Sequence, residues 1–175
     1  MIISKHKESS IRQNYFFIKG NLSDINTKYF IDKIEQGIRE ESALNGKTNV
    51  KGNMTSYQYF NSDPEFFNLT HLFMNYIDKN ISINPYGIQD SWGLKETFGH
   101  YTQNHNHFGS LWSGVVYLSN ANQPLVFTDI KEEVEAKIGN FAIFTSILNH
   151  ETKNRVFKNE TKYALSFNFA ELSSH

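Results

Sequence analysis

The chain has 175 residues, a length that suits one domain, and 39% of them are hydrophobic, enough to bury a core without disulfides or a structural metal. The formal net charge of −1 gives no overall attraction to nucleic acid or to an anionic membrane, so we expect neither as a partner. The absence of cysteine excludes thiol catalysis, iron–sulfur clusters and thiolate zinc sites, and it suits a cytoplasmic protein. Residues 1–5 precede no long apolar run, so we expect no signal peptide or membrane anchor there.

Helical patterns occupy the first half of the chain. Ser23-Asp24 would cap a helix, and Asp63-Pro64 places a cap and a helix-opening proline before a second one. The apolar stripes that follow these caps are Ile25, Tyr29, Phe30, Ile31, Ile34 and Ile38 in the first, and Phe66, Phe67, Thr70, Phe73, Met74 and Ile77 in the second. Between the helices, residues 49–60 are rich in Thr and Tyr and predict a strand, although Gly52 weakens it.

Short strands separated by turn residues follow Pro85. The predicted strands are 88–98, 111–119, 125–130, 141–146 and 163–170. Helices followed by a run of strands favour an α+β fold, a curled antiparallel sheet or jelly roll with the helices packed on one face. We expect a single domain over 1–175. Residues 1–84 would form a helical support region with one or two strands, and 85–170 would form the β core.

His105 and His107 lie one residue apart, directly before an apolar strand. Side chains at i and i+2 of a strand share one face, with Cα atoms roughly 6.5 Å apart. Two imidazoles at this spacing can bind one ion, and neutral imidazole suits Zn, Cu, Fe and Ni. The alternative is a pair of polar residues at the end of a loop. His100 has an odd separation from His105 and should face elsewhere.

A second set of signals follows further along the chain. Gly139 makes a turn, residues 141–144 form an apolar strand, His150 ends that stretch, and Lys162 opens the final strand. This order resembles the Fe(II)/2-oxoglutarate-dependent oxygenases, and in particular their compact prolyl-hydroxylase-like branch with a double-stranded β-helix. The resemblance covers about residues 88–170. Its two motifs are His-x-His followed by Ser-Gly-Val-x-Tyr-Leu at 113–118, and a distal His followed by a cation before Ser-Phe-Asn at 166–168.

The resemblance implies a dioxygenase that uses Fe(II), 2-oxoglutarate and O₂ to hydroxylate an unactivated C–H bond of a small molecule or peptide. This branch implies a peptidyl proline or a free amino acid as the substrate. The metal ligands would be His105, His107 and His150. The family's usual trio is His-x-Asp/Glu…His, so His107 stands where a carboxylate is expected. Alternatively, one histidine lies outside the ligand set and Asp129 replaces it, unless Asp129 is a turn residue that closes a strand.

The resemblance also implies a site for the co-substrate. Lys162 stands where the family keeps an arginine for the far carboxylate of 2-oxoglutarate, and a lysine lacks the bidentate fork of arginine. The family's serine two residues later is replaced by Ala164, but Ser166 could donate instead. Arg155 is a rival cation. Tyr117 matches a position that often reaches the co-substrate, and its alternative role is that of a core tyrosine.

Two other kinds of β-barrel protein share some of these features. A cupin-like enzyme also uses His-x-His, but its motif requires a glutamate about four residues later, where Ser110 and Leu111 lie. A non-catalytic jelly roll that only binds a peptide or sugar would suit the missing carboxylate. Trp92 and Trp112 are interpreted as core or pocket-wall residues.

Overall fold

The computed structural model describes residues 2–3, 15–80 and 85–172, so most of the stretch 1–5 lies outside the described residues. The elements in chain order are β1 (Ile2–Ile3), β2 (Phe17–Asn21), α1 (Thr27–Gly37), β3 (Asn53–Met54), α2 (Pro64–Asp78), β4 (Tyr86–Glu96), β5 (Trp112–Tyr117), β6 (Leu125–Phe127), β7 (Glu132–Val134), β8 (Asn140–Thr145), β9 (His150–Thr152) and β10 (Lys162–Glu171). None of the helices in these ranges is long and apolar enough to cross a membrane.

Both helices begin with a side-chain cap. Asp63 caps α2 as predicted, with Pro64 as the first helical residue. The predicted cap of α1 at residues 23–24 is wrong, because Asn26 caps the helix. Its side-chain oxygen accepts a hydrogen bond from the backbone N–H three residues later, at 3.2 Å. Ile25 therefore lies before the helix.

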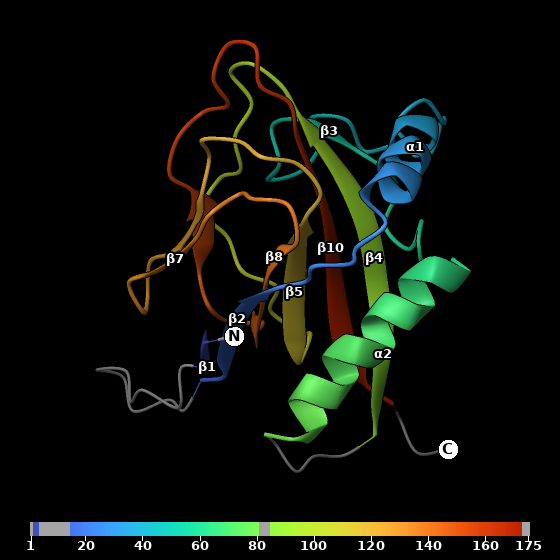
Figure 1. Cartoon of the computed structure of the whole chain (residues 1–175), viewed down its shortest axis with the longest axis vertical. Helices are drawn as coiled ribbons and strands as arrows, with labels where there is room; N and C mark the ends of the chain where they lie inside the picture. Colours follow the sequence, from blue (N-terminus) through green and yellow to red (C-terminus); the bar gives the residue numbers. More distant parts are fainter. Residues whose placement is uncertain (1, 4–14, 81–84, 173–175) are drawn as a thin grey trace.

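Within the described residues, the strands form two antiparallel sheets, one of seven strands in the order β1-β2-β8-β5-β10-β4-β3 and one of three in the order β7-β6-β9 (Figure 1). All five strands predicted after Pro85 are present, although β6 is shorter than expected. The strand predicted at 49–60 shrinks to β3, and turns follow it at 57–62. β2, β7 and β9 were not predicted, because three to five residues are too few to show a periodic pattern.

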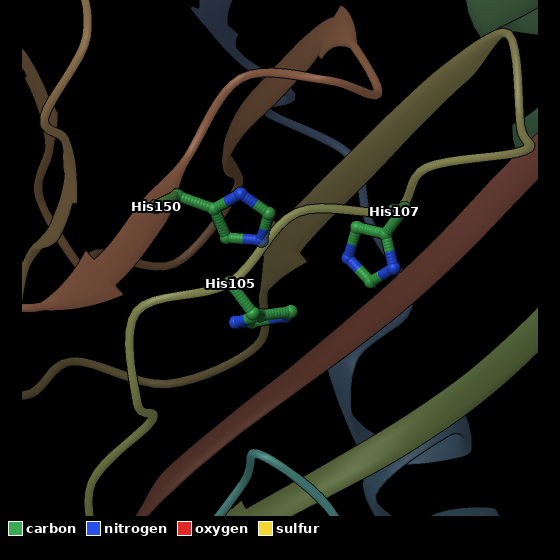
Figure 2. Close-up of side chains that lie close together, drawn as sticks. All are labelled: His105, His107 and His150. Atoms are coloured by element: carbon green, nitrogen blue, oxygen red, sulfur yellow. The ribbon is translucent and has the colours of Figure 1, made fainter.

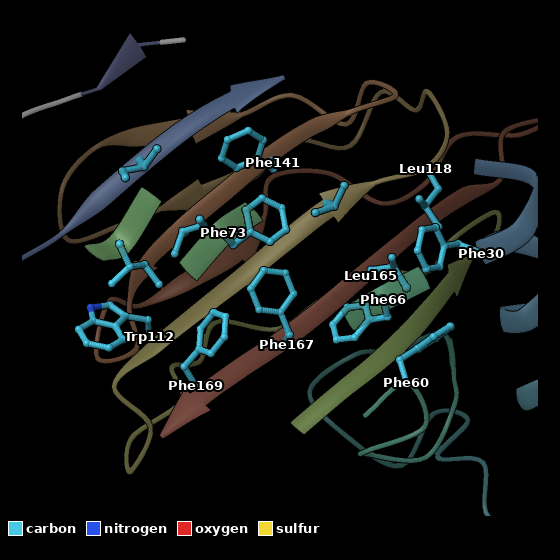
Figure 3. Close-up of a cluster of buried hydrophobic side chains, with 14 of the residues drawn as sticks. Phe30, Phe60, Phe66, Phe73, Trp112, Leu118, Phe141, Leu165, Phe167 and Phe169 are labelled. Carbon is cyan, nitrogen blue, oxygen red and sulfur yellow. The ribbon is translucent and has the colours of Figure 1, made fainter. Parts of the chain in front are cut away.

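One face of the large sheet carries the helices and most of the aromatic core (Figure 3). Phe73 of α2 stacks on Phe167 of β10, with ring centroids 5.1 Å apart. Ile34 of α1 packs so tightly on β4 that a Cβ at Gly93 would lie 2.2 Å from it. This arrangement confirms the predicted α+β fold with helices on one face.

The opposite face of the large sheet carries several polar side chains beside a cavity. Side chains alternate between faces along a strand, and β10 divides its residues accordingly. Those on the helix side are Leu165, Phe167 and Phe169, whereas those on the opposite side are Lys162, Ala164 and Ser166. On β4, Trp92, Leu94 and Glu96 pair in register with Ser166, Ala164 and Lys162. A cavity lies between this face and the small sheet.

Candidate functional site

Three histidines converge on one point of the cavity (Figure 2). His105 and His107 come from the loop between β4 and β5, and His150 opens β9. Their ligand nitrogens all lie within 4.8 Å of one another. Metal–nitrogen bonds are about 2.0–2.1 Å long, so nitrogens bound to one ion lie at most about 4.2 Å apart, and the rings would draw closer together on binding. Among the residues that the structure describes, these three histidines form the group of side chains that could hold a metal ion.

Backbone hydrogen bonds hold these three side chains together. The His105 N–H donates to the His150 carbonyl at 3.1 Å, and the His150 N–H donates back at 2.9 Å, which forms an isolated antiparallel bridge. The His107 N–H donates to the carbonyl of Ser146 at 2.8 Å. The loop before β5 is therefore fastened at two points to the segment that carries His150. These backbone hydrogen bonds, together with side-chain contacts, therefore set the distances between the three imidazole rings.

The orientation of two rings leaves a nitrogen free for a metal. Nδ1 of His105 lies 2.8 Å from the Gln103 carbonyl, and Nδ1 of His150 lies 2.9 Å from the Leu148 carbonyl. Since a carbonyl only accepts, Nδ1 carries the proton in both rings and the lone pair is on Nε2. Burial, together with the neighbouring histidines, lowers the pKa of His107 and that of His150 to about 3. These imidazoles are neutral at pH 7, which is the form that binds a metal.

Asp129, the alternative ligand, lies outside the histidine cluster. It is exposed beyond the end of β6, and its carboxylate accepts hydrogen bonds from the backbone N–H of Asn149 at 2.7 Å and from the Asn149 side chain at 3.1 Å. These contacts tie two loops together. They match the interpretation of Asp129 as a residue that closes a strand.

We expect Asp129→Ala to leave metal affinity unchanged and to lower the free energy of unfolding by about 1 kcal/mol or less, because an exposed hydrogen-bonded carboxylate contributes little. Titration of the variant with Fe(II) or Mn(II), next to a urea unfolding curve, measures both quantities. Loss of metal binding by a protein that keeps its fold would make Asp129 a ligand.

The predicted co-substrate residues line the same cavity as the histidines. The cavity has a volume of about 50 Å³, and Tyr117, Lys162 and Ser166 are in its wall. Arg155, the rival cation, is exposed on a loop, where it donates to the Gly99 carbonyl at 3.0 Å and lies over the ring of Tyr101. The structure therefore brings Lys162, and not Arg155, into the cavity of the histidines.

Lys162 already has polar partners, which the sequence reasoning missed. Its ammonium group forms an ion pair with Glu96 and donates a hydrogen bond to Oε1 of Gln123. The side chains of Lys162 and Glu96 are only 3% and 0% exposed. One feature of the sequence could have indicated Glu96 as a partner. Glu96 alternates with Trp92 and Leu94 along β4, which places its carboxylate on the cavity face. Its pairing with Lys162 required the register of two strands that are distant in sequence.

Tyr117 is fully buried. Burial and the nearby Glu96 carboxylate raise the pKa of its phenol, which therefore keeps its proton and can donate a hydrogen bond. The core interpretation and the co-substrate interpretation of Tyr117 are compatible, because the residue packs in the core beneath the cavity and also lines it.

The two tryptophans have different surroundings. Trp112 packs in the aromatic core on the helix side. Trp92 lines the cavity, with its ring centroid 5.8 Å from that of His107, and it also borders a neighbouring groove of about 180 Å³ that reaches Tyr57 and Asn106. Nε1 of Trp92 is buried and has no hydrogen-bond partner among the described residues. A buried donor without a partner is a candidate contact for a ligand.

Known proteins resemble this chain in structure and not in sequence. No family model matches, and no curated protein matches. The chain is similar to the viral collagen prolyl hydroxylase of Paramecium Bursaria Chlorella virus-1, solved with 2-oxoglutarate, at 18% identity and a TM-score of 0.67, over 90% of this chain and 96% of that one. It is also similar to a prolyl-4-hydroxylase of Pseudomonas putida, at 13% identity and a TM-score of 0.66, over 90% of this chain and 93% of that one.

The likeness is not confined to prolyl hydroxylases. The non-haem α-ketoglutarate-dependent carbocyclase SnoK of nogalamycin biosynthesis matches at 13% identity and a TM-score of 0.68, over 94% of this chain and 80% of that one. These matches confirm the fold that the sequence motifs implied. The chain has the double-stranded β-helix fold of the 2-oxoglutarate-dependent oxygenases, and the similar structures include members of the prolyl-hydroxylase-like branch.

Proposed function

We propose that this protein is an Fe(II)- and 2-oxoglutarate-dependent dioxygenase that hydroxylates an unactivated C–H bond. The observation that carries the proposal is that three histidines with converging nitrogens share one cavity with a buried lysine. Neither the cupin-like enzyme nor the non-catalytic jelly roll accounts for this pairing of a nitrogen-rich metal site with a cation for a carboxylate. The fold likeness to known oxygenases supports the same assignment.

The residues present fit a divalent iron ion. His105, His107 and His150 offer neutral nitrogen donors, which suit Fe(II), and a set of three protein ligands leaves coordination positions open. With His107 in place of a carboxylate, the protein ligands bring no negative charge, so the ion keeps its full positive charge toward an anionic co-substrate. When bound, iron with 2-oxoglutarate supplies the activation of O₂ that C–H hydroxylation needs.

The chain's own side chains bind and orient the organic co-substrate in this proposal. Lys162 attracts the far carboxylate, while the hydroxyl groups of Tyr117 and Ser166 donate hydrogen bonds from the same cavity wall. Apolar side chains such as Val115 and Phe144 keep the cavity dry, which strengthens each of these contacts.

For the substrate, we propose a peptidyl proline or a free amino acid, in a protein of the reducing cytoplasm. Two of the similar structures are prolyl hydroxylases. The groove next to the histidines, bordered by Tyr57, Trp92 and Asn106, offers aromatic and amide surfaces that suit a peptide. The absence of cysteine suits the proposed compartment.

The test is mass spectrometry of proline-containing peptides and free amino acids incubated with the protein, Fe(II), 2-oxoglutarate and ascorbate. We expect one oxygen atom to be added to a substrate, with succinate formed in equal amount. His150→Ala is the matched control and should give neither product. A protein that binds no divalent metal, or that binds metal without any 2-oxoglutarate binding or turnover, would contradict the proposed function.

The unpartnered N–H of Trp92 leads to a second prediction. If it donates to the substrate, Trp92→Phe keeps the ring and removes the donor, and one hydrogen bond of about 1–1.5 kcal/mol corresponds to roughly a tenfold rise in KM for the substrate. The dissociation constant of 2-oxoglutarate should not change. Trp112→Phe, on the helix side of the sheet, is the control and should change stability without changing KM. Equal KM values for wild type and Trp92→Phe would refute this role.

A further inference from the structure

The cation proposed to bind the co-substrate already has a resident counter-ion. Lys162 and Glu96 lie directly opposite each other on β10 and β4, on the cavity side of the sheet, and both side chains are buried. An ammonium group has three N–H donors. Glu96 and Gln123 engage it before any ligand arrives, and the lysine–glutamate pair is neutral overall.

Glu96 has little room to move away from this lysine. A Cβ at Gly52 would lie 2.8 Å from Cγ of Glu96, so the backbone of the preceding loop closes over that side chain. The hydroxyl of Thr102 also donates to Oε1 of Glu96, at 3.4 Å. A ligand carboxylate that approaches Lys162 must therefore share it with the fixed carboxylate of Glu96, at the cost of like-charge repulsion in a site with little water.

We infer that Glu96 is a specificity-determining residue for the co-substrate, which weakens the binding of a dicarboxylic 2-oxo acid by competing for Lys162. The inference rests on the proposed function. With Glu96 in place, the charge of the ligand's far end contributes little to its affinity. A 2-oxo acid with a neutral far end that accepts a hydrogen bond binds nearly as well as 2-oxoglutarate.

The test varies the charge of the protein and of the ligand together. The ligands are 2-oxoglutarate and its 5-amide, which has the same length and a neutral far end, and the protein is loaded with Mn(II) as a redox-quiet metal. Isothermal titration calorimetry gives the dissociation constants for wild type and for Glu96→Gln. Glu35→Gln is the matched control, because Glu35 pairs with Lys95 at 2.6 Å on the helix side, away from the cavity.

For wild type, we expect the two ligands to differ by less than about tenfold. In Glu96→Gln, the dissociation constant of 2-oxoglutarate should fall by about tenfold or more while that of the amide hardly changes, since neighbouring charges couple by this order. Glu35→Gln should match wild type. Kinetics should agree, with a lower KM for 2-oxoglutarate in Glu96→Gln.

Three results would overturn the inference. An unchanged ratio of the two dissociation constants in Glu96→Gln, or weaker binding of 2-oxoglutarate by that variant, would make Glu96 a residue that only supports Lys162. The third is a preference of wild type for 2-oxoglutarate by more than about a hundredfold, which decides the question even if Glu96→Gln fails to fold. If wild type binds Mn(II) but neither ligand, the proposed function fails and this inference fails with it.

Discussion

Alanine at His150 is expected to abolish metal binding while the protein stays folded. Loss of a residue that only orients a ligand costs about 10- to 100-fold in metal affinity, so loss of a direct ligand should cost at least as much. His105→Ala and His107→Ala should each show the same defect, because the three nitrogens form one cluster. Titration with Fe(II) under anaerobic conditions measures the affinity, and circular dichroism checks the fold.

Two further variants make this result specific. His71→Ala is the control, since His71 is exposed on α2 and belongs to no cluster of metal ligands found in the described part of the chain. His107→Asp introduces the carboxylate of the ligand trio that is usual in the oxygenases this chain resembles, and it should keep the metal. If His107→Ala binds iron as tightly as wild type, the third ligand is not His107 and the all-histidine site is wrong.

Lys162→Ala is expected to raise the apparent KM for 2-oxoglutarate by two or more orders of magnitude. The physical reason is that alanine offers the ligand no donor and leaves the buried Glu96 carboxylate next to the ligand's far carboxylate without a cation. An uncompensated buried charge costs about 3–5 kcal/mol, at about 1.4 kcal/mol per tenfold. The same change should destabilise the folded protein, because it leaves Glu96 buried without its cation. Steady-state kinetics and urea unfolding measure the two effects, and iron affinity should survive.

The two effects of the lysine can be separated with a double variant. Lys162→Met combined with Glu96→Gln removes both charges at similar volume, so it should recover stability without recovering the binding of 2-oxoglutarate. Arg155→Ala is the control outside the cavity and should leave KM unchanged. If Arg155→Ala abolishes dependence on 2-oxoglutarate while Lys162→Ala does not, the assignment of the cation is wrong.

The sequence alone determined those features that depend on local spacing. The cap and proline at Asp63-Pro64 place the start of α2, and alternation along residues 162–169 separates an aromatic helix face from a polar face. The spacing of His105 and His107 predicted a shared metal site, and the structure brings both side chains to His150. The first two features follow from the geometry of a single helix or strand, so a few neighbouring residues suffice to reveal them. The two histidines lie in the loop before β5, and backbone hydrogen bonds to the segment of His150 hold them in place.

Only the tertiary structure decided which residues meet across the sheets. The bridge between His105 and His150 depends on how a loop crosses β9, and the pairing of Glu96 with Lys162 depends on the register of strands 66 residues apart. Such contacts form because burial brings distant segments together, and a shift of one residue would turn every side chain to the other face. No local pattern contains that choice.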